Sequence, residues 1–253
     1  MPSPNPLKTA LARNERQLGL WLSLASATAT ELAARAGFDW VLIDMEHTTL
    51  GESEALAHLR AARGGTAETV VRVPWNDAVI IKRMLDAGAR SIIVPQVQNA
   101  EEARRAVAAT RYPPDGIRGF SGITRANDYG RTKDYPTTAA NEIFLTVQVE
   151  SPEAVRNAAE IAAVEGVDGV FVGPNDLAAN MGLVGQAGHP SVREAIASVI
   201  APVRAAGKAP GVLDFNIASS KSWFDMGFSW IAVGSDLSLL RAGVDALLAS
   251  YRA

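Results

Sequence analysis

Short runs of apolar, β-branched residues alternate with longer Ala-rich segments of helical period along the chain. Runs such as Ser91-Ile92-Ile93-Val94 are apolar at nearly every position, which indicates strands buried on both faces of a parallel sheet. The pattern predicts strands near residues 17–23, 39–44, 69–73, 91–95, 143–149, 169–173, 209–213 and 230–234. It predicts helices near residues 28–37, 51–63, 77–88, 99–111, 152–164, 191–206, 216–227 and 236–252.

These elements form eight strand–helix units that follow one another without a break in composition. An open, doubly wound sheet would show the same alternation, but eight uninterrupted units favour a closed α/β barrel. The length of 253 residues is also typical of that fold. We therefore predict a single (β/α)8 TIM-barrel domain over residues 1–253.

Residues 112–141 interrupt the alternation. This stretch contains four glycines and three prolines, which argue against a regular element. It follows the fourth unit, so it should start at the N-terminal end of the barrel, away from the face where barrel enzymes carry out chemistry. It is either a surface excursion or an oligomer contact that reaches a neighbouring subunit's site.

Composition narrows the class of protein. Hydrophobic residues make up 48% of the chain and the net charge is −3, so nothing points to nucleic acid or to an acidic membrane as a partner. The absence of cysteine rules out disulfides, thiolate metal sites and a cysteine nucleophile. No apolar run reaches the length of a membrane span, and Met1-Pro2-Ser3-Pro4-Asn5-Pro6 does not resemble a signal peptide. A cytoplasmic protein is the expectation.

Two carboxylates follow two successive predicted strands. Glu150 ends the run from Ile143, and Asp176 follows the run from Gly169. In a parallel barrel, neighbouring strands bring their C-terminal ends together at the active face. Two acids with open coordination positions suit a hard divalent cation such as Mg²⁺ or Mn²⁺. Either acid could instead serve the start of a helix, Asp176 as an N-cap.

Other polar groups occur at the same predicted face. Asp44, Glu46 and His47 follow the second strand, and Arg72 lies within the apolar third strand. A charge inside a strand is costly unless it is paired, so Arg72 requires an anionic partner. Taken alone, His47 and Glu46 could be solvated loop residues. Gly234-Ser235 could be a phosphate cradle or only a tight turn, and His58 and His189 are interpreted as structural or solvated.

Several motifs occur in order along almost the whole chain. They are Gly37-Phe38-Asp39-Trp40, Ile43-Asp44-x-Glu46-His47, Val71-Arg72-Val73, Val94-Pro95-x-Val97, Arg111-Tyr112-Pro113-Pro114-x-Gly116-Ile117-Arg118-Gly119, Gln148-x-Glu150 and Glu165-Gly166-Val167-Asp168-Gly169-Val170-Phe171-x-Gly173-Pro174-x-Asp176-Leu177. Together they resemble the HpcH/HpaI aldolase family, and most closely its 4-hydroxy-2-oxo-acid aldolase branch, the class II pyruvate aldolases of aromatic catabolism. The longer citrate-lyase-like and malyl-CoA-lyase-like members are less similar.

The resemblance implies a (β/α)8 barrel whose last helix exchanges between subunits, usually in a homohexamer built as a trimer of dimers. It implies a divalent cation (Mg²⁺, Mn²⁺ or Co²⁺) held by Glu150 and Asp176. Arg72 matches the arginine that contacts the pyruvate oxygen, and His47 with Asp44 matches an acid–base dyad. The substrate-binding positions that match are Gln148, Gly173, Pro174, Asn175, Trp21, Leu213 and, near a neighbouring subunit's site, Asp86.

Two residues depart from the family pattern. Asn175 stands where a small residue is common, which predicts either a pocket for a more polar donor such as hydroxypyruvate or altered contacts to the donor carboxylate. Met45 replaces a glycine often found before Glu46, which could shift the loop that holds His47.

The implied activity is a metal-dependent aldolase, a carbon–carbon lyase acting on 4-hydroxy-2-oxo acids. No lysine is predicted at a strand end near this cluster, which counts against a Schiff-base aldolase. Three alternatives stay open at this point. They are a phosphosugar isomerase that uses Gly234-Ser235, a lyase acting on CoA thioesters, and a barrel without catalytic activity that binds 2-oxo acids.

Overall fold

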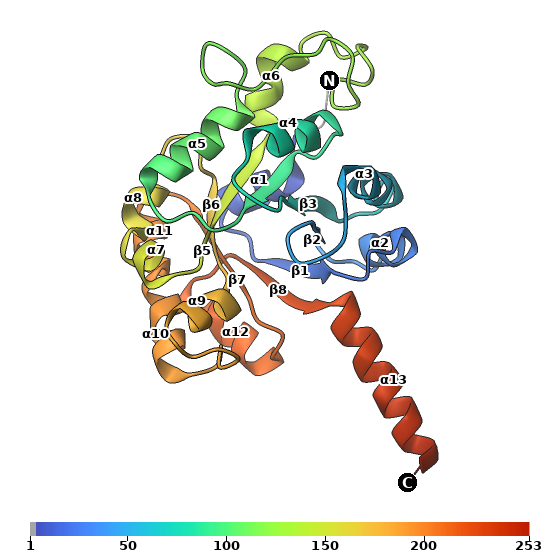
Figure 1. Cartoon of the computed structure of the whole chain (residues 1–253), viewed down its shortest axis with the longest axis vertical. Helices are drawn as coiled ribbons and strands as arrows, with labels where there is room; N and C mark the ends of the chain where they lie inside the picture. The colour runs from blue at the N-terminus through green and yellow to red at the C-terminus, as the bar shows by residue number, and fades with distance from the viewer. Residues whose placement is uncertain (1–3, 253) are drawn as a thin grey trace.

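The computed structural model describes residues 4–252, and eight parallel strands close into a barrel in the order of the sequence (Figure 1). Each strand pairs with the next along the chain, and β8 pairs with β1, which completes the predicted (β/α)8 barrel. Every strand lies within two residues of its predicted position. The strands are β1 (Gln17–Leu22), β2 (Trp40–Asp44), β3 (Glu68–Arg72), β4 (Ser91–Val94), β5 (Phe144–Val149), β6 (Gly169–Val172), β7 (Ala209–Leu213) and β8 (Trp230–Ser235).

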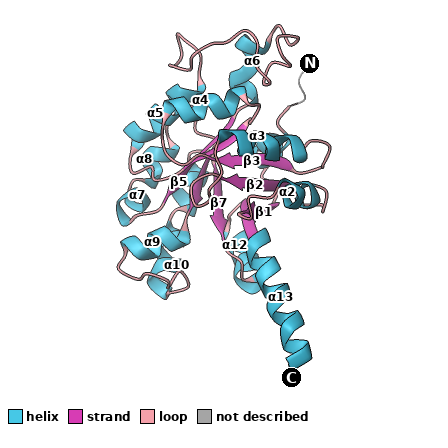
Figure 2. Ribbon diagram, turned by 45° about the vertical axis from the view of Figure 1, so that its right-hand side comes forward, coloured by secondary structure: helices cyan, strands magenta, loops and turns pink. Residues whose placement is uncertain are grey.

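Helices follow each strand and cover the outside of the barrel (Figure 2). Six helices agree with single predicted segments: α2 (Ala27–Ala34), α3 (Glu52–Ala61), α4 (Ala78–Asp86), α5 (Ala100–Thr110), α12 (Ile217–Met226) and α13 (Asp236–Arg252). Two predicted helices are each divided in two, giving α7 (Pro152–Arg156) with α8 (Ala158–Ala162), and α10 (Pro190–Ser198) with α11 (Ile200–Ala205).

Three helices were not predicted. They are α1 (Pro6–Ala12), α6 (Tyr135–Glu142) and α9 (Pro174–Asn180). Each is short and has proline in its first turn, where a missing N–H costs no intrahelical hydrogen bond. Of these prolines, only Pro136 is counted against a regular element in the sequence, whereas it lies in the first turn of α6.

The interior of the barrel is filled largely by aromatic side chains. Trp40, Phe171 and Trp230 are fully buried, and their ring centroids lie 4.9 to 6.3 Å apart in tilted or edge-to-face arrangements. Two strand glycines make room for the indoles. A Cβ at Gly19 would lie 2.0 Å from Trp40, and one at Gly211 would lie 2.4 Å from Trp230. A second, larger apolar layer packs between the strands and the helices.

The irregular stretch after α5 lies at the end of the barrel opposite the strand C-termini, as predicted. The amide of Ala126 donates to the carbonyl of Asp86 at 3.2 Å, and Arg125 Nη1 donates to the carbonyl of Ala87 at 2.8 Å. Both carbonyls belong to the C-terminal end of α4, so the stretch covers that helix end.

Helix α13 leaves the barrel after β8 and projects away from it (Figures 1 and 2). None of its residues is buried, although it carries a row of large apolar side chains: Leu237, Leu239, Leu240, Val244, Leu247, Leu248 and Tyr251. Among residues 4–252, no helix is both long and apolar enough to cross a membrane. The comparison of the first residues with a signal peptide falls partly on residues 1–3, which lie outside the described residues.

Candidate active site

The C-terminal ends of the strands enclose a cavity of about 210 Å³. Most of the predicted site residues line it: Trp21, Asp44, His47, Arg72, Gln148, Gly173, Pro174, Asn175, Asp176 and Leu213. Glu150 is fully buried directly after β5. Ser23, Phe171, Phe215 and Ser235 also line the cavity. The first three were not singled out in the sequence, because neither their residue type nor their spacing distinguishes them from core or loop positions.

Arg72 has the anionic partners that its place in a strand required. Its Nε donates to Asp44 Oδ1 at 2.9 Å and its Nη2 to Asp44 Oδ2 at 2.7 Å, while Nη1 lies 2.7 Å from Glu46 Oε2. The pairing of β2 with β3 places Asp44 directly beside Arg72. Burial alone would raise the pKa of the Asp44 carboxyl, but the hydrogen bonds and charge of Arg72 bring it below its ordinary value.

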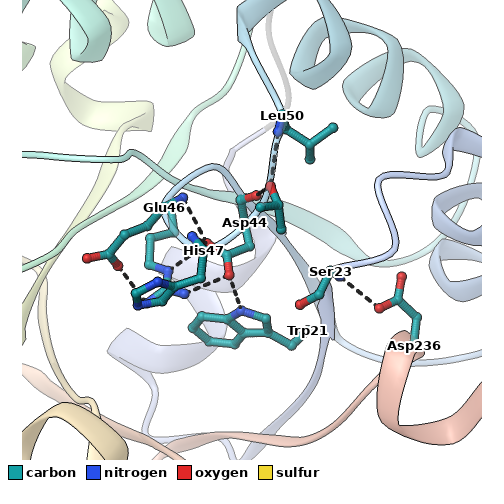
Figure 3. A network of polar contacts seen from close by, with 9 residues as sticks. Trp21, Ser23, Asp44, Glu46, His47, Leu50 and Asp236 are labelled. Carbon is teal, nitrogen blue, oxygen red and sulfur yellow. Dashed lines mark hydrogen bonds and ion pairs between the residues drawn. The ribbon is translucent and has the colours of Figure 1, made fainter. Parts of the chain in front are cut away.

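Trp21 contacts both members of the Asp44–Arg72 pair. Its indole Nε1 donates to Asp44 Oδ2 at 3.0 Å (Figure 3), and the guanidinium carbon of Arg72 lies 4.8 Å from the centre of the Trp21 rings. The stacked indole and the carboxylate together fix the plane of the guanidinium. Trp21, predicted only as an apolar wall, therefore also contributes a hydrogen bond to the site.

The loop after β2 turns around Asp44. Asp44 Oδ1 accepts hydrogen bonds from the backbone N–H groups of Glu46 at 3.0 Å and His47 at 3.3 Å (Figure 3). The Thr48 hydroxyl donates to the carbonyl of Asp44. Met45 is buried in the apolar layer outside the strands and anchors the loop there. This departure from the family pattern thus fits into the core.

His47 is exposed at the mouth, and within the described part of the chain its ring makes no hydrogen bond. Asp44 contacts His47 through the backbone N–H only, because the carboxylate is already occupied by Arg72 and Trp21. The two members of the predicted dyad are therefore neighbours, while the expected orientation of the imidazole by Asp44 is not found. Glu46, which we had interpreted as a possible solvated charge, is instead paired with Arg72.

Glu150 is a buried carboxylate with an incomplete set of partners. Gln96 Nε2 donates to its Oε2 at 2.6 Å, while Oε1 has no hydrogen-bond partner among residues 4–252. Burial, together with the negative charges of Glu46 and Asp176, raises the pKa of Glu150 to about 8, against the opposing effect of Arg72. A bound cation would stabilise this buried oxygen, because it has no hydrogen-bond partner and lies near other carboxylates.

Asp176 lies in the first turn of α9, two residues after Pro174, and is half-buried at the cavity. It is not the N-cap of that helix, which is Gly173. A Cβ at Gly173 would lie 3.0 Å from the Glu150 carboxyl group, so glycine leaves this space open.

Like Glu150 Oε1, the side-chain carbonyl oxygen of Gln148 is buried and lacks a hydrogen-bond partner among the described residues.

The donor set fits a divalent cation held by few protein ligands. The chain over residues 4–252 contains no group of three or more His, Cys, Asp or Glu side chains arranged around a metal position. Glu150 and Asp176 would therefore supply two carboxylates and leave the other positions to water or substrate, as Mg²⁺ commonly requires. The orphaned Glu150 Oε1 is the observation that favours this interpretation.

Asp86 is not brought to this cavity. It ends α4, at the opposite end of the barrel, and accepts a hydrogen bond from Arg118 Nη2 at 2.7 Å. The Arg118 side chain is fully buried, and its guanidinium stacks 4.5 Å from the ring centre of Tyr112. Any role for Asp86 in catalysis would therefore concern the site of another subunit.

The turn after β8 is unsuited to a phosphate. Ser235 Oγ accepts from the backbone N–H of Ser238 at 3.1 Å. Asp236 accepts from the backbone N–H of Ser23 at 2.7 Å (Figure 3) and from that of Leu24 at 3.2 Å. The carboxylate thus takes the N–H groups that an anion would use and repels a second negative charge. This finding argues against the isomerase alternative.

The other two histidines have structural roles, as interpreted from the sequence. His58 Nδ1 lies 2.7 Å from the hydroxyl of Thr30, and both residues are buried between α2 and α3. His189 is the N-cap of α10, where its Nδ1 accepts from the N–H of Ser191.

Comparisons with known proteins identify the family of this chain. The model of the HpcH/HpaI aldolase/citrate lyase family matches residues 17–242. A 4-hydroxy-2-oxo-heptane-1,7-dioate aldolase of Salmonella dublin is 48% identical over 250 residues, covering 98% of this chain and 95% of that protein. A crystal structure of a HpcH/HpaI aldolase/citrate lyase family protein from Burkholderia cenocepacia J2315 is 40% identical, with a TM-score of 0.95 over 98% of this chain and 100% of the other. The citrate synthase SbnG is 29% identical, with a TM-score of 0.86 over 98% and 97% of the two chains.

Proposed function

Because this chain belongs to the HpcH/HpaI aldolase/citrate lyase family, we propose that it is a metal-dependent aldolase. It reversibly cleaves 4-hydroxy-2-oxo acids into an aldehyde and pyruvate, or a related 2-oxo acid such as hydroxypyruvate. The similarity to the Salmonella aldolase over 98% of the chain supports this reaction. The single structural observation that supports it most is the cluster at the strand ends in which the buried Arg72–Asp44 pair acts on the same region as the carboxyl groups of Glu150 and Asp176.

Glu150 and Asp176 would hold the divalent cation, Mg²⁺, Mn²⁺ or Co²⁺, at the mouth of the barrel. When bound, such an ion acts as a Lewis acid that polarises the 2-oxo group of the donor. Gln148, with a free buried carbonyl oxygen, and the open space beside Gly173 would complete the donor pocket. The exposed amide of Asn175 lines the same cavity and can bind a hydroxyl on the donor.

Arg72 is the residue that would stabilise negative charge on the donor oxygen. A guanidinium has five N–H groups. Asp44 accepts hydrogen bonds from its Nε and Nη2, and Glu46 forms an ion pair with Nη1, so N–H groups on both terminal nitrogens remain for the substrate. Since two carboxylates and an indole fix the guanidinium in place, the cation is preorganised before the charge develops.

His47 would move the proton of the 4-hydroxyl group. Its imidazole lies at the mouth of the cavity and is free of protein hydrogen bonds among residues 4–252, so it can reach a substrate directly or through water. We therefore assign the proton transfer at the carbon–carbon bond to His47.

We infer that the protein acts as a homo-oligomer, a hexamer built as a trimer of dimers. Helix α13 supports this assembly, because it presents a row of exposed leucines and packs none of them against its own barrel. Exchange of α13 between two subunits would bury that row.

The proposed reaction is tested with a panel of 4-hydroxy-2-oxo acids. Pyruvate release is measured with the metal-loaded protein, after exhaustive chelation, and after Mg²⁺ is restored. We expect activity to vanish with the chelator and to return with the ion. A Glu150→Gln/Asp176→Asn double variant should stay inactive at any metal concentration. Turnover that survives both treatments would contradict metal dependence, and no turnover in any state would favour a non-catalytic 2-oxo-acid-binding barrel.

A further inference from the structure

The buried carboxylate of Glu150 is held by a side chain from the neighbouring strand. Gln96 lies two residues after the end of β4, and its Nε2 donates to Glu150 Oε2 at 2.6 Å. Glu150 has no exposed surface, and within residues 4–252 this is the only hydrogen bond that its side chain makes. Gln96 therefore sets the orientation of the carboxylate.

The two oxygens of Glu150 face different strands. Oε2 faces Gln96, on the side of β4. A Cβ built at Gly173, which directly follows β6, would lie 3.0 Å from Oε1, so this oxygen is turned toward the strand that Asp176 follows. Oε1 has no hydrogen-bond partner among the described residues. Gln96 thus occupies one oxygen and leaves the other on the side of the second acid.

The backbone of Gln96 adopts a conformation that its residue type disfavours. Its φ is 55°, in the left-handed region that residues other than glycine rarely occupy. Pro95 and Val97 on either side are buried, and the N–H of Val97 donates to the carbonyl of Gln148 at 3.1 Å, which fixes the loop beside β5. Glycine would fit here without strain but could not supply an amide to Glu150. Strain retained at such a position points to a function of the side chain.

An amide bound to one carboxylate oxygen limits how that carboxylate can bind a cation. Ca²⁺ takes many oxygen ligands in flexible geometry and often binds both oxygens of one carboxylate. Mg²⁺ is smaller, requires near-octahedral geometry and keeps several water molecules, so single oxygens from few carboxylates suffice. With Oε2 engaged by Gln96, Glu150 offers a cation one oxygen only.

We propose that Gln96 is a positioning residue, which restricts Glu150 to binding a cation through Oε1 and thereby favours Mg²⁺ over Ca²⁺. This inference rests on the proposed metal site of Glu150 and Asp176 and deepens it, because it assigns ion selectivity to a residue that is not a ligand. Partners that hydrogen-bond to a metal ligand orient that ligand and tune the affinity of the site.

Two variants of Gln96 test the contact. Gln96→Met keeps the length of the side chain and removes the donor. Gln96→Asn keeps the amide on a side chain one methylene shorter, and asparagine tolerates the left-handed backbone better, so this variant tests the contact without added strain. Gln17→Met is the matched control. Gln17 is also buried, but it starts β1 at the opposite end of the barrel, where its Nε2 donates to the carbonyl of Arg16 at 2.9 Å.

The measurement is the dissociation constant of Mg²⁺ and of Ca²⁺, obtained by calorimetry on chelator-treated protein. Thermal unfolding of each variant confirms that it is folded. We expect both Gln96 variants to raise the dissociation constant of Mg²⁺ about 10- to 100-fold, as for other partners of metal ligands. The constant for Ca²⁺ should rise much less, because the released Oε2 becomes a second contact for the larger ion. Gln17→Met should change neither constant.

The ratio of the two constants decides the outcome. A higher ratio of the Mg²⁺ constant to the Ca²⁺ constant in the Gln96 variants supports the assignment. An equal rise of both constants would show a general loss of the site, and unchanged constants would show that the amide has no effect on the ion; either result overturns the inference while the metal site stands. A wild type that binds neither ion overturns both. Because the measurement needs no turnover, failure of the aldolase reaction alone does not affect it.

Discussion

Asp44 and Arg72 lie directly opposite each other on β2 and β3 and form two parallel hydrogen bonds, at 2.9 and 2.7 Å. Both side chains are almost completely buried, with 2% and 6% exposed. A buried guanidinium of this kind depends on its carboxylate, because removal of one partner leaves an unpaired charge. Asp44 is therefore first of all the residue that positions Arg72.

This relationship predicts the effect of Asp44→Asn. The variant keeps the size of the side chain but loses one of the two carboxylate acceptors of Arg72. We expect pyruvate methyl proton exchange and carbon–carbon cleavage to fall together, by about 10²-fold, because both need the cation in place. Asp225→Asn, at an exposed pair with Arg16, is the control. If exchange survives while cleavage is lost, Asp44 serves His47 instead.

Arg72→Ala should impair formation of the enolate more than binding of the aldehyde. The variant removes the guanidinium that faces the donor oxygen, and loss of such a group typically costs about 10²–10³ in kcat. The measurement is deuterium exchange of the pyruvate methyl group without aldehyde present. Arg83→Ala, which removes an exposed arginine paired with Glu52, provides the comparison. Wild-type exchange in Arg72→Ala would rule out the assigned role.

His47→Ala should separate the two halves of the reaction. The exposed imidazole is assigned to the 4-hydroxyl group, so the variant should still exchange pyruvate methyl protons while its cleavage rate falls by roughly 10²–10⁴. Equal loss of exchange and cleavage would show that His47 removes the methyl proton or holds the whole site together.

Glu150 should make the stability of the metal-free protein depend on pH. In the folded state the pKa of Glu150 is raised from 4.5 to about 8, mainly by burial and then by Glu46 and Asp176. The folded protein therefore holds this proton more tightly than the unfolded chain does. The stability it contributes is present below about pH 4.5 and is lost as the pH rises to about 8.

The measurement is the free energy of unfolding by denaturant, with a chelator present, between pH 5 and 8.5. We expect the wild type to lose stability over this interval by an amount on the order of a few kcal/mol. Glu150→Gln, which cannot ionise, should lose clearly less. A parallel decline in the two proteins would show that Glu150 is already ionised at the lower pH.

Much of the architecture can be inferred from the sequence alone. Continuous apolar runs such as β4 and β6 can only be buried on both faces, and their regular alternation with helices leaves few topologies. The acids Glu150 and Asp176 could be predicted for the same reason, since they follow successive strands. In each case the same local pattern recurs once in every strand–helix unit. Because each strand of the closed barrel lies beside the next one in the sequence, residues at the ends of successive strands become neighbours.

What could not be predicted depends on side chains that meet across the barrel. That Asp44 is occupied by Arg72 and Trp21, and not by the ring of His47, follows from the stagger of β1, β2 and β3. The stacking of Arg193 on Trp223 joins residues 30 positions apart, on two helices that only the closed barrel brings together. The short helices α1, α6 and α9 begin at or next to prolines, and only the surrounding contacts distinguish a helix start from a turn there. The sequence therefore determined the eight strands, the main helices between them and most of the residues that reach the mouth, because those depend on local periodicity. Tertiary structure decided which of these groups touch, because strand stagger and helix packing set the distances between residues remote in the chain.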